Sequence, residues 1–220
     1  MAMNKYRDRI INLGKEAGAQ IVLPEMTDVR VREAARELIS MDFDILNIED
    51  FQDNLDIYLD FLNKLPFTDN WPADNLREFL NDPLHFAMAM VACDDADCLV
   101  AGAVNSSSEV IRSAIRMIGI RPTSNQVSSI FFMISPDGNS AFTFADCAVI
   151  PDPDSKQLAA IGAESAEFHH FLTGDEPLVA FLSFSTKGSA SHYRVDRVRD
   201  AVEMFGNKYP QIIQDRKSVV

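Results

Sequence analysis

The stretch CLVAGAVNSSSEVIRSAIRMI, which runs from Cys98 to Ile118, decides the fold class of this chain. Its first part, residues 98–104, is a continuous apolar run, as expected for a strand buried on both faces of a sheet. Its last part has apolar residues at helical spacing. Asn105 and three serines join the two parts. A strand, a short polar junction and a helix in this order predict an α/β fold with a mostly parallel, buried sheet.

The same alternation of strands and helices continues on both sides of this stretch. Expected strands cover residues 21–24, 44–48, 98–104 and 178–185, and another is expected to begin at Ile212. Expected helices cover residues 4–17, 29–40, 105–118, 154–171 and 193–209, and a further one opens at Asp82-Pro83, where proline suits the first helical turn.

One hairpin interrupts the alternation. Two β-rich runs, over residues 127–135 and 141–150, surround Pro136-Asp-Gly-Asn, which is a hairpin signal. The preceding segment GIRPTSN is turn-forming, and the pattern changes there. We therefore predict a first α/β domain over residues 1–122 and a second α/β domain, which carries the hairpin, over residues 123–220.

The composition argues against several classes of protein. The 220 residues are 47% hydrophobic, and the formal net charge of −13 argues against binding to nucleic acid or to an anionic membrane. The charged N-terminus is unlike a signal peptide, and no apolar run reaches transmembrane length. Three scattered cysteines, Cys93, Cys98 and Cys147, suggest reduced thiols in a cytoplasmic protein and give no spacing typical of a zinc site.

The junction inside the opening stretch is a candidate anion site. Asn105 to Ser108 supply side-chain donors where a helix N-terminus leaves backbone N–H groups unpaired. Ser108, Arg112 and Arg116 then follow at intervals of four on one helical face, and a guanidinium can bind phosphate with two parallel hydrogen bonds. The alternative is structural: a serine in this place is an ordinary N-cap, and Arg112 pairs with Glu109.

A second junction of similar composition lies in LSFSTKGSASH, residues 182–192. The residues that can donate to an anion or add positive charge there are Ser185, Thr186, Lys187, Gly188 and Ser189. The alternative is a capped helix start after a flexible loop. Two such junctions in one α/β chain favour a shared anionic ligand, because ligands bind at strand ends in these folds. Asp146 is either a buried polar group or a substrate-orienting carboxylate.

Five motifs of this chain resemble those of the phosphate acetyl/butyryl transferase family. They are IVLPEMTDVRVREAA, DADCLVAGAVNSSSEVIRSAI, VSSIFFMISPDG, FADCAVIPDPDSKQLAAI and LSFSTKGSASHYRVDRVRDA, in the family's order and approximate spacing. The resemblance covers about residues 21–213, and the third and fourth motifs are more similar to the acetyl branch. Relatives continue beyond PQIIQD with a segment that carries an aspartate for thiol deprotonation, so the resemblance also implies a C-terminally shortened chain.

The resemblance implies reversible movement of an acetyl group between phosphate and coenzyme A. The partners would be small molecules, namely acetyl phosphate, phosphate and coenzyme A, with coenzyme A a substrate, no tightly bound cofactor and no metal. The implied fold has two α/β/α domains with the active site in the cleft between them, similar to isocitrate/isopropylmalate dehydrogenase, and it forms a homodimer through the second domain. The alternative is a non-catalytic relative that binds acyl phosphate or coenzyme A, or serves as a partner subunit.

The resemblance also assigns roles to single residues. Arg112 matches the family's phosphate-binding arginine and, with Ser185, is the expected catalytic residue. Substrate-binding roles fall to Asn105, Ser106, Ser107, Ser128, Ser129, Thr186, Lys187, Gly188 and Ser189. Asn105 stands where many relatives have histidine. The segment FLNKLPFTDN has no arginine where relatives carry one for coenzyme A, which leaves Lys64 as a substitute.

Overall fold

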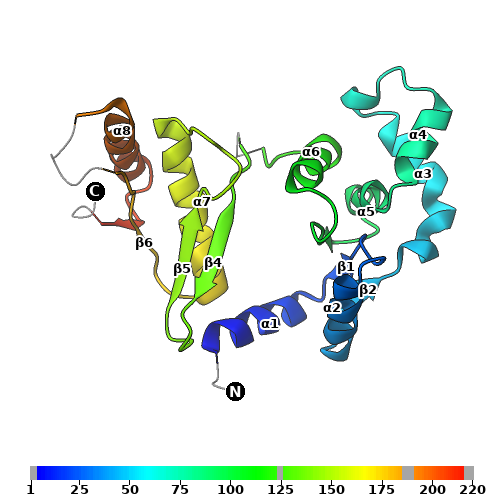
Figure 1. Ribbon diagram of the computed structural model, residues 1–220, viewed down its shortest axis with the longest axis horizontal. Coiled ribbons are helices and arrows are strands. Elements are labelled where there is room, and N and C mark those ends of the chain that lie inside the picture. The colour runs from blue at the N-terminus through cyan, green and yellow to red at the C-terminus, as the bar shows by residue number, and fades with distance from the viewer. Residues whose placement is uncertain (1–3, 123–125, 185–190, 216–220) are drawn as a thin grey trace. The chain divides into compact units, whose positions relative to one another are not determined.

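The computed structural model describes residues 4–122, 126–184 and 191–215, and it confirms the predicted α/β fold with a parallel sheet. Figure 1 shows the helices and strands in chain order. The chain divides into two compact units, which are described separately below. We call Leu13–Arg121 the N-terminal unit, and Met1–Asn12 together with Pro122–Val220 the C-terminal unit. The domain limits given above, residues 1–122 and 123–220, stay a prediction.

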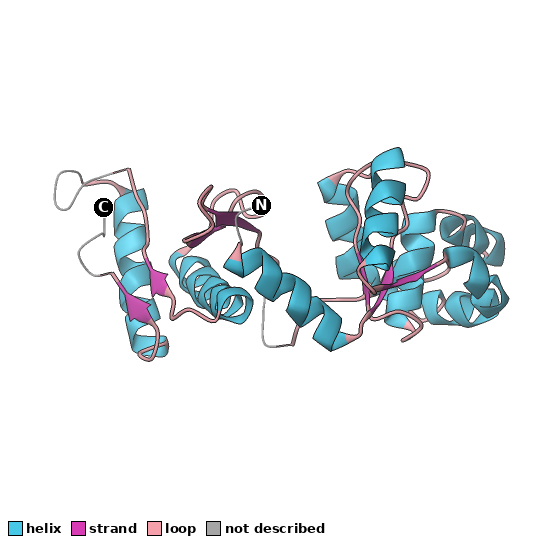
Figure 2. Cartoon of the chain, turned by 90° about the horizontal axis from the view of Figure 1, so that it is seen from below, coloured by secondary structure: helices cyan, strands magenta, loops and turns pink. Residues whose placement is uncertain are grey.

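A three-stranded parallel sheet organises the N-terminal unit. Helix α1 (Lys5–Ala17) contributes residues to both units, and the further elements are β1 (Gln20–Val22), α2 (Val29–Ser40), β2 (Asp44–Leu46), the 3-10 helix η1 (Ile48–Asn54), α3 (Leu55–Leu62), the 3-10 helix η2 (Pro66–Thr68), α4 (Ala73–Leu80), α5 (Pro83–Ala92), β3 (Cys98–Leu99) and α6 (Ser107–Met117). The strands pair in the order β2-β1-β3, and Ile21 of the central strand pairs with Ile45 and Cys98. Figure 2 shows these short strands flanked by helices.

The core of the N-terminal unit gathers around α5. The Asp82 carboxylate accepts from the Leu84 N–H at 2.8 Å and caps this helix, as the Asp-Pro pair predicts. The residues from Phe86 to Met90 are all buried, so the helix is apolar on every side and is enclosed by its neighbours. Helix α4 has no counterpart among the expected helices, because its short charged sequence offers only Leu76 and Leu80 as strongly buried apolar positions.

Strand β3 is shorter than its apolar run suggests, and the expected strand is wrong beyond Leu99. The Val100 N–H still donates to the Val22 carbonyl at 3.2 Å. From Gly102 onward, however, the backbone N–H groups donate to the side chain of Glu25 and not to a neighbouring strand. Gly102 has a φ of 112°, which glycine adopts without steric cost, and the chain leaves the sheet there.

The C-terminal unit contains the predicted hairpin and two long helices. Its elements are β4 (Ile130–Ile134), β5 (Ala141–Ala145), α7 (Ser155–Thr173), β6 (Leu178–Val179), α8 (Tyr193–Lys208) and β7 (Ile213–Gln214). Strands β4 and β5 pair antiparallel, and the Ser135 N–H donates to the Ser140 carbonyl at 2.8 Å across the turn, which confirms the hairpin. Helix α7 lies along the hairpin (Figure 1). A second small core joins Phe181, Ala201 and Phe205.

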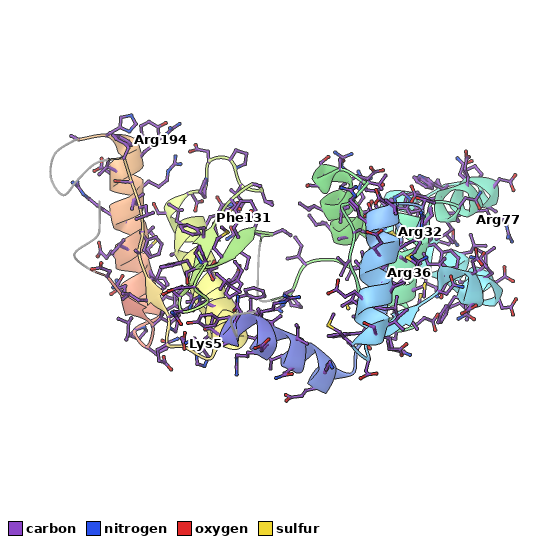
Figure 3. The ribbon with its side chains drawn as sticks, turned by 60° about the horizontal axis from the view of Figure 1, so that its bottom comes forward. Lys5, Arg32, Arg36, Arg77, Phe131 and Arg194 are labelled. Carbon is purple, nitrogen blue, oxygen red and sulfur yellow. The ribbon has the colours of Figure 1, made fainter. Side chains whose placement is uncertain are left out.

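The hairpin is apolar on both faces. Its inner face contacts α7, where the Phe132 and His169 rings lie 6.3 Å apart between centroids. Its outer face carries four large side chains that are each more than half exposed: Phe131 (60%), Met133 (51%), Phe142 (55%) and Phe144 (52%). Phe131, labelled in Figure 3, pairs across the strands with Phe144, and Met133 pairs with Phe142. We call these four residues the hairpin patch.

Candidate functional site

The carboxyl ends of β1 and β3 lie side by side, because the two strands are parallel neighbours. The segment after Val22, which contains Glu25, therefore meets the segment after Leu99, which leads into helix α6. The first of the two predicted junctions thus lies at the sheet edge where ligands bind in α/β folds.

Glu25 organises this edge. The residue is buried, and its carboxylate accepts four backbone hydrogen bonds. Its Oε2 accepts from the Gly102 and Ala103 N–H groups at 2.9 and 2.7 Å, and its Oε1 accepts from Val104 and Asn105 at 3.0 and 2.7 Å. Burial by itself raises the pKa of this carboxyl, but the four donors outweigh burial and hold the pKa below its ordinary value. We call residues 102–105 the carboxylate-bound loop.

Arg30 binds a carbonyl oxygen of the same loop. Its Nη2 donates to the Ala103 carbonyl at 2.8 Å and to Asp28 Oδ2 at 2.8 Å. Asp28 also accepts from the Arg30 N–H and so caps helix α2. The hydrogen bonds from Arg30 lower the pKa of Asp28 to about 2. Glu25, in the connection between β1 and α2, and Arg30, in the first turn of α2, therefore bind the donors and an acceptor of the carboxylate-bound loop.

Helix α6 begins directly after this loop, and Ser106 is its N-cap. The Ser106 hydroxyl accepts from the Glu109 N–H at 3.3 Å and lies 3.2 Å from the Ser108 hydroxyl. Ser106, Ser107 and Ser108 are exposed, whereas Asn105 is half-buried. Because Glu25 takes the Asn105 N–H, an anion at this place would be met by side chains and by helix N–H groups beyond the loop.

Arg112 is exposed, one helical turn beyond Ser108. Among the residues that the structure describes, no carboxylate lies within ion-pair distance of Arg112, so the alternative in which it pairs with Glu109 is not seen. Arg116, a turn further on, lies over the Phe67 ring at 5.6 Å. A guanidinium that has no carboxylate partner in the described ranges, one turn from a cluster of serines at a helix start, is an arrangement suited to a phosphate group.

In the C-terminal unit, Ser129 and Asp146 form a hydrogen-bonded cluster with the backbone around them. The Ser129 hydroxyl donates to Asp146 Oδ1 and accepts from the Cys147 and Ala148 N–H groups at 3.0 and 2.8 Å. Asp146 also accepts from the N–H groups of Ser129 at 3.0 Å and Ile150 at 2.5 Å. Burial raises the pKa of Asp146, but these donors, the Ser129 hydroxyl foremost, lower it to about 2. Of the two roles left open for Asp146, this geometry favours a structural polar group, which is half-buried and held by these hydrogen bonds.

The structure says less about the other predicted site residues. Ser128 is half-buried and lies two residues before the first residue of strand β4, with Ser129 between them. The residues Ser185, Thr186, Lys187, Gly188 and Ser189 lie outside the described part of the chain. The predicted cleft between two domains and the predicted anionic ligand shared by the two junctions stay predictions.

Glu25 is the residue that sequence reasoning missed. Its signal is a glutamate three residues beyond a strand, in the IVLPE motif, but nothing in that spacing says which backbone amides it binds. Within the described ranges, no group of three or more His, Cys, Asp and Glu side chains is placed to hold a metal ion. Nor does any helix in those ranges have the length and hydrophobicity of a membrane span.

Comparisons with known proteins agree with this picture. Residues 39–215 match the family model described as phosphate acetyl/butaryl transferase. The phosphate acetyltransferase of Acetivibrio thermocellus is 32% identical, over 96% of this chain and 71% of that protein. A phosphotransacetylase structure from Staphylococcus aureus superposes with a TM-score of 0.77 at 30% identity, covering 97% of this chain and 73% of that one. A phosphotransacetylase structure from Streptococcus pyogenes gives a TM-score of 0.72 at 27% identity, over 96% of this chain and 70% of that one.

Proposed function

Because this chain belongs to the phosphate acetyl/butyryl transferase family, we propose that it moves an acetyl group reversibly between inorganic phosphate and coenzyme A. The relatives above are phosphate acetyltransferases, which supports the acetyl branch. The observation that carries the proposal is Arg112, an exposed guanidinium without a carboxylate partner among the described residues, one turn from the serines that begin α6.

In this proposal Arg112 binds the phosphate group of acetyl phosphate with two parallel hydrogen bonds. Ser106 and Ser107 donate to its remaining oxygens, with the side chain of Asn105 beside them. We further expect residues 185–189, with Ser185 in a catalytic role, to supply more donors and the charge of Lys187. Neutralising the phosphate favours its departure, because charge that builds up on the leaving oxygen is stabilised.

The reaction itself is a direct acyl transfer. The thiol of coenzyme A, with a pKa of about 8.5 for an ordinary thiol, releases its proton to the solvent, and the thiolate attacks the acetyl carbon. A carbon–sulfur bond forms, the carbon–oxygen bond to phosphate breaks, and phosphate leaves with the electron pair. Coenzyme A is a substrate, and the scheme uses no tightly bound cofactor and no metal. We place the reaction in the cytoplasm, where the free thiols of Cys93, Cys98 and Cys147 would stay reduced.

The direct test is thioester formation from acetyl phosphate and coenzyme A by the purified chain, with butyryl phosphate as the competing substrate. Turnover with a preference for acetyl phosphate supports the proposal. Binding of both substrates without turnover supports instead the non-catalytic relative considered above. Absence of both turnover and binding contradicts the proposal.

We also propose that the protein is a homodimer that forms through the hairpin patch. Monomeric proteins rarely expose a contiguous apolar patch of this kind, and four large side chains in two cross-strand pairs form a face that a second copy can match by symmetry.

Phe144→Glu is expected to convert the dimer to a monomer, because the substitution places a charge within the face that the dimer would bury. Light scattering coupled to gel filtration measures the mass. Phe171→Glu is the matched control, since Phe171 is an exposed phenylalanine of helix α7 outside the patch. A monomeric parent protein, or a dimer that survives in Phe144→Glu, contradicts this interface.

A further inference from the structure

We propose that Glu25 is a positioning residue for acyl-phosphate binding: its carboxylate fixes the carboxylate-bound loop, and the loop in turn fixes Asn105 and the start of helix α6 beneath the phosphate. The inference rests on the proposed function, because it gives Glu25 a task in that same site. Nothing in the sequence motifs assigns a role to this residue.

The geometry shows how completely the loop depends on Glu25. Only 5% of the surface of Glu25 is exposed, and four consecutive N–H groups, from Gly102 to Asn105, donate to its two oxygens at 2.7 to 3.0 Å. Consecutive amides cannot all point toward one group in a strand, where they alternate in direction, so the carboxylate selects the turned conformation. Gly102, with its φ of 112°, supplies the backbone freedom at the first of these positions.

The loop ends at the residue before the helix cap, so its conformation sets the position of the site. Asn105 donates its backbone N–H to Glu25 and is followed at once by Ser106, the N-cap of α6. Arg112 then projects from the second turn of the same helix. A rotation of the loop would therefore move the serines and the guanidinium together. A small misplacement of groups that bind the phosphate can lower the reaction rate strongly.

The same hydrogen bonds exclude a role for Glu25 as the base that deprotonates the thiol. Each oxygen accepts two N–H groups, which favours the ionised form and leaves the carboxylate a weak proton acceptor. The side chain is also enclosed, so a thiol cannot approach it without displacing the loop. Glu25 acts on the substrate only through the loop.

Glu25→Gln tests the proposal with little change in shape. The glutamine keeps one accepting oxygen but turns an NH₂ group toward two of the four loop amides, which then lose their acceptor. Asp95→Asn is the matched structural control, because the Asp95 carboxylate accepts from Tyr58 at 2.7 Å and from Asn54 at 3.0 Å, two residues of the same unit outside the loop.

Two measurements are made on the full chain. Hydrogen exchange of the amides of residues 102–105 is expected to be about tenfold faster or more in Glu25→Gln and unchanged in Asp95→Asn. The KM for acetyl phosphate is expected to rise about tenfold or more in Glu25→Gln, with the KM for coenzyme A within about twofold, because only the phosphate-binding groups move. Asp95→Asn is expected to lower thermal stability without this split between the two KM values.

Unchanged exchange in the loop overturns the inference, and so does faster exchange with an unchanged KM for acetyl phosphate. An equal rise in both KM values, or the same kinetic change in Asp95→Asn, would show that Glu25 serves stability alone. If the parent chain shows no turnover, the proposed reaction fails first, and calorimetric titration with inorganic phosphate replaces the KM. In that case a phosphate affinity that is equal in parent and Glu25→Gln, or absent from the parent, overturns the positioning role.

Discussion

Arg112→Ala is expected to lower kcat/KM for acetyl phosphate by about 30- to 1,000-fold, or about 2–4 kcal/mol of transition-state binding. The guanidinium has no carboxylate partner among the described residues, so its loss removes a contact to the substrate and leaves no buried charge unpaired in the protein. We therefore expect a large kinetic effect with little change in thermal stability. Steady-state thioester formation and a melting curve measure the two quantities.

Two further variants sharpen this test. Arg112→Lys keeps the charge but loses the planar pair of donors, so it is expected to recover only part of the activity. Arg116→Ala removes the next arginine on the same face, which lies over Phe67, and is expected to leave kcat/KM within about threefold. An Arg112→Ala protein with unchanged kinetics, or an equal loss in Arg116→Ala, would refute the role given to Arg112.

Asp146→Ala is expected to lower the free energy of unfolding of the C-terminal unit by about 2 kcal/mol. The substitution leaves the hydroxyl and N–H of Ser129 and the Ile150 N–H without their acceptor. Chemical denaturation followed by circular dichroism measures the loss. Asp137→Ala is the control, because Asp137 binds Ser135 and Asn139 in an exposed turn and its loss is expected to matter less. Equal stability of Asp146→Ala and the parent would contradict a structural role for the hydrogen-bonded cluster of Ser129 and Asp146.

The contribution of Asp146 to stability should also depend on pH. Folding lowers the pKa of Asp146 from 3.8 to about 2, so folding favours the ionised form. The contribution is fully present above pH 3.8 and is lost as the pH falls toward about 2. The parent should therefore lose its advantage over Asp146→Asn across this window, and a constant difference in unfolding free energy down to pH 2 would contradict the assignment.

The helices were the most predictable part of this protein. Helix α2 begins and ends where its apolar spacing and the Asp28 cap predict, and α8 differs from its expected range by one residue. These limits follow from local chemistry, because a cap and a periodic face are properties of neighbouring residues. The strands are shorter than their apolar runs, since a strand ends where its partner ends or where its N–H groups find another acceptor. The β3 strand shows this, because Glu25, 77 residues away from Gly102, takes the amides that would have extended it.

The candidate site also has features that local sequence predicts and contacts that it does not. The family, the α/β class and the placement of Arg112 and three serines at the start of one helix follow from the sequence alone, because motifs and helical spacing are patterns of nearby residues. The binding of the Ser129 hydroxyl by Asp146 and two amides, and of Glu25 by the loop before that helix, is seen only in the folded chain. These contacts join residues that are remote in sequence, and a buried polar group can be satisfied by any partner that folding brings within reach, so no local pattern names that partner.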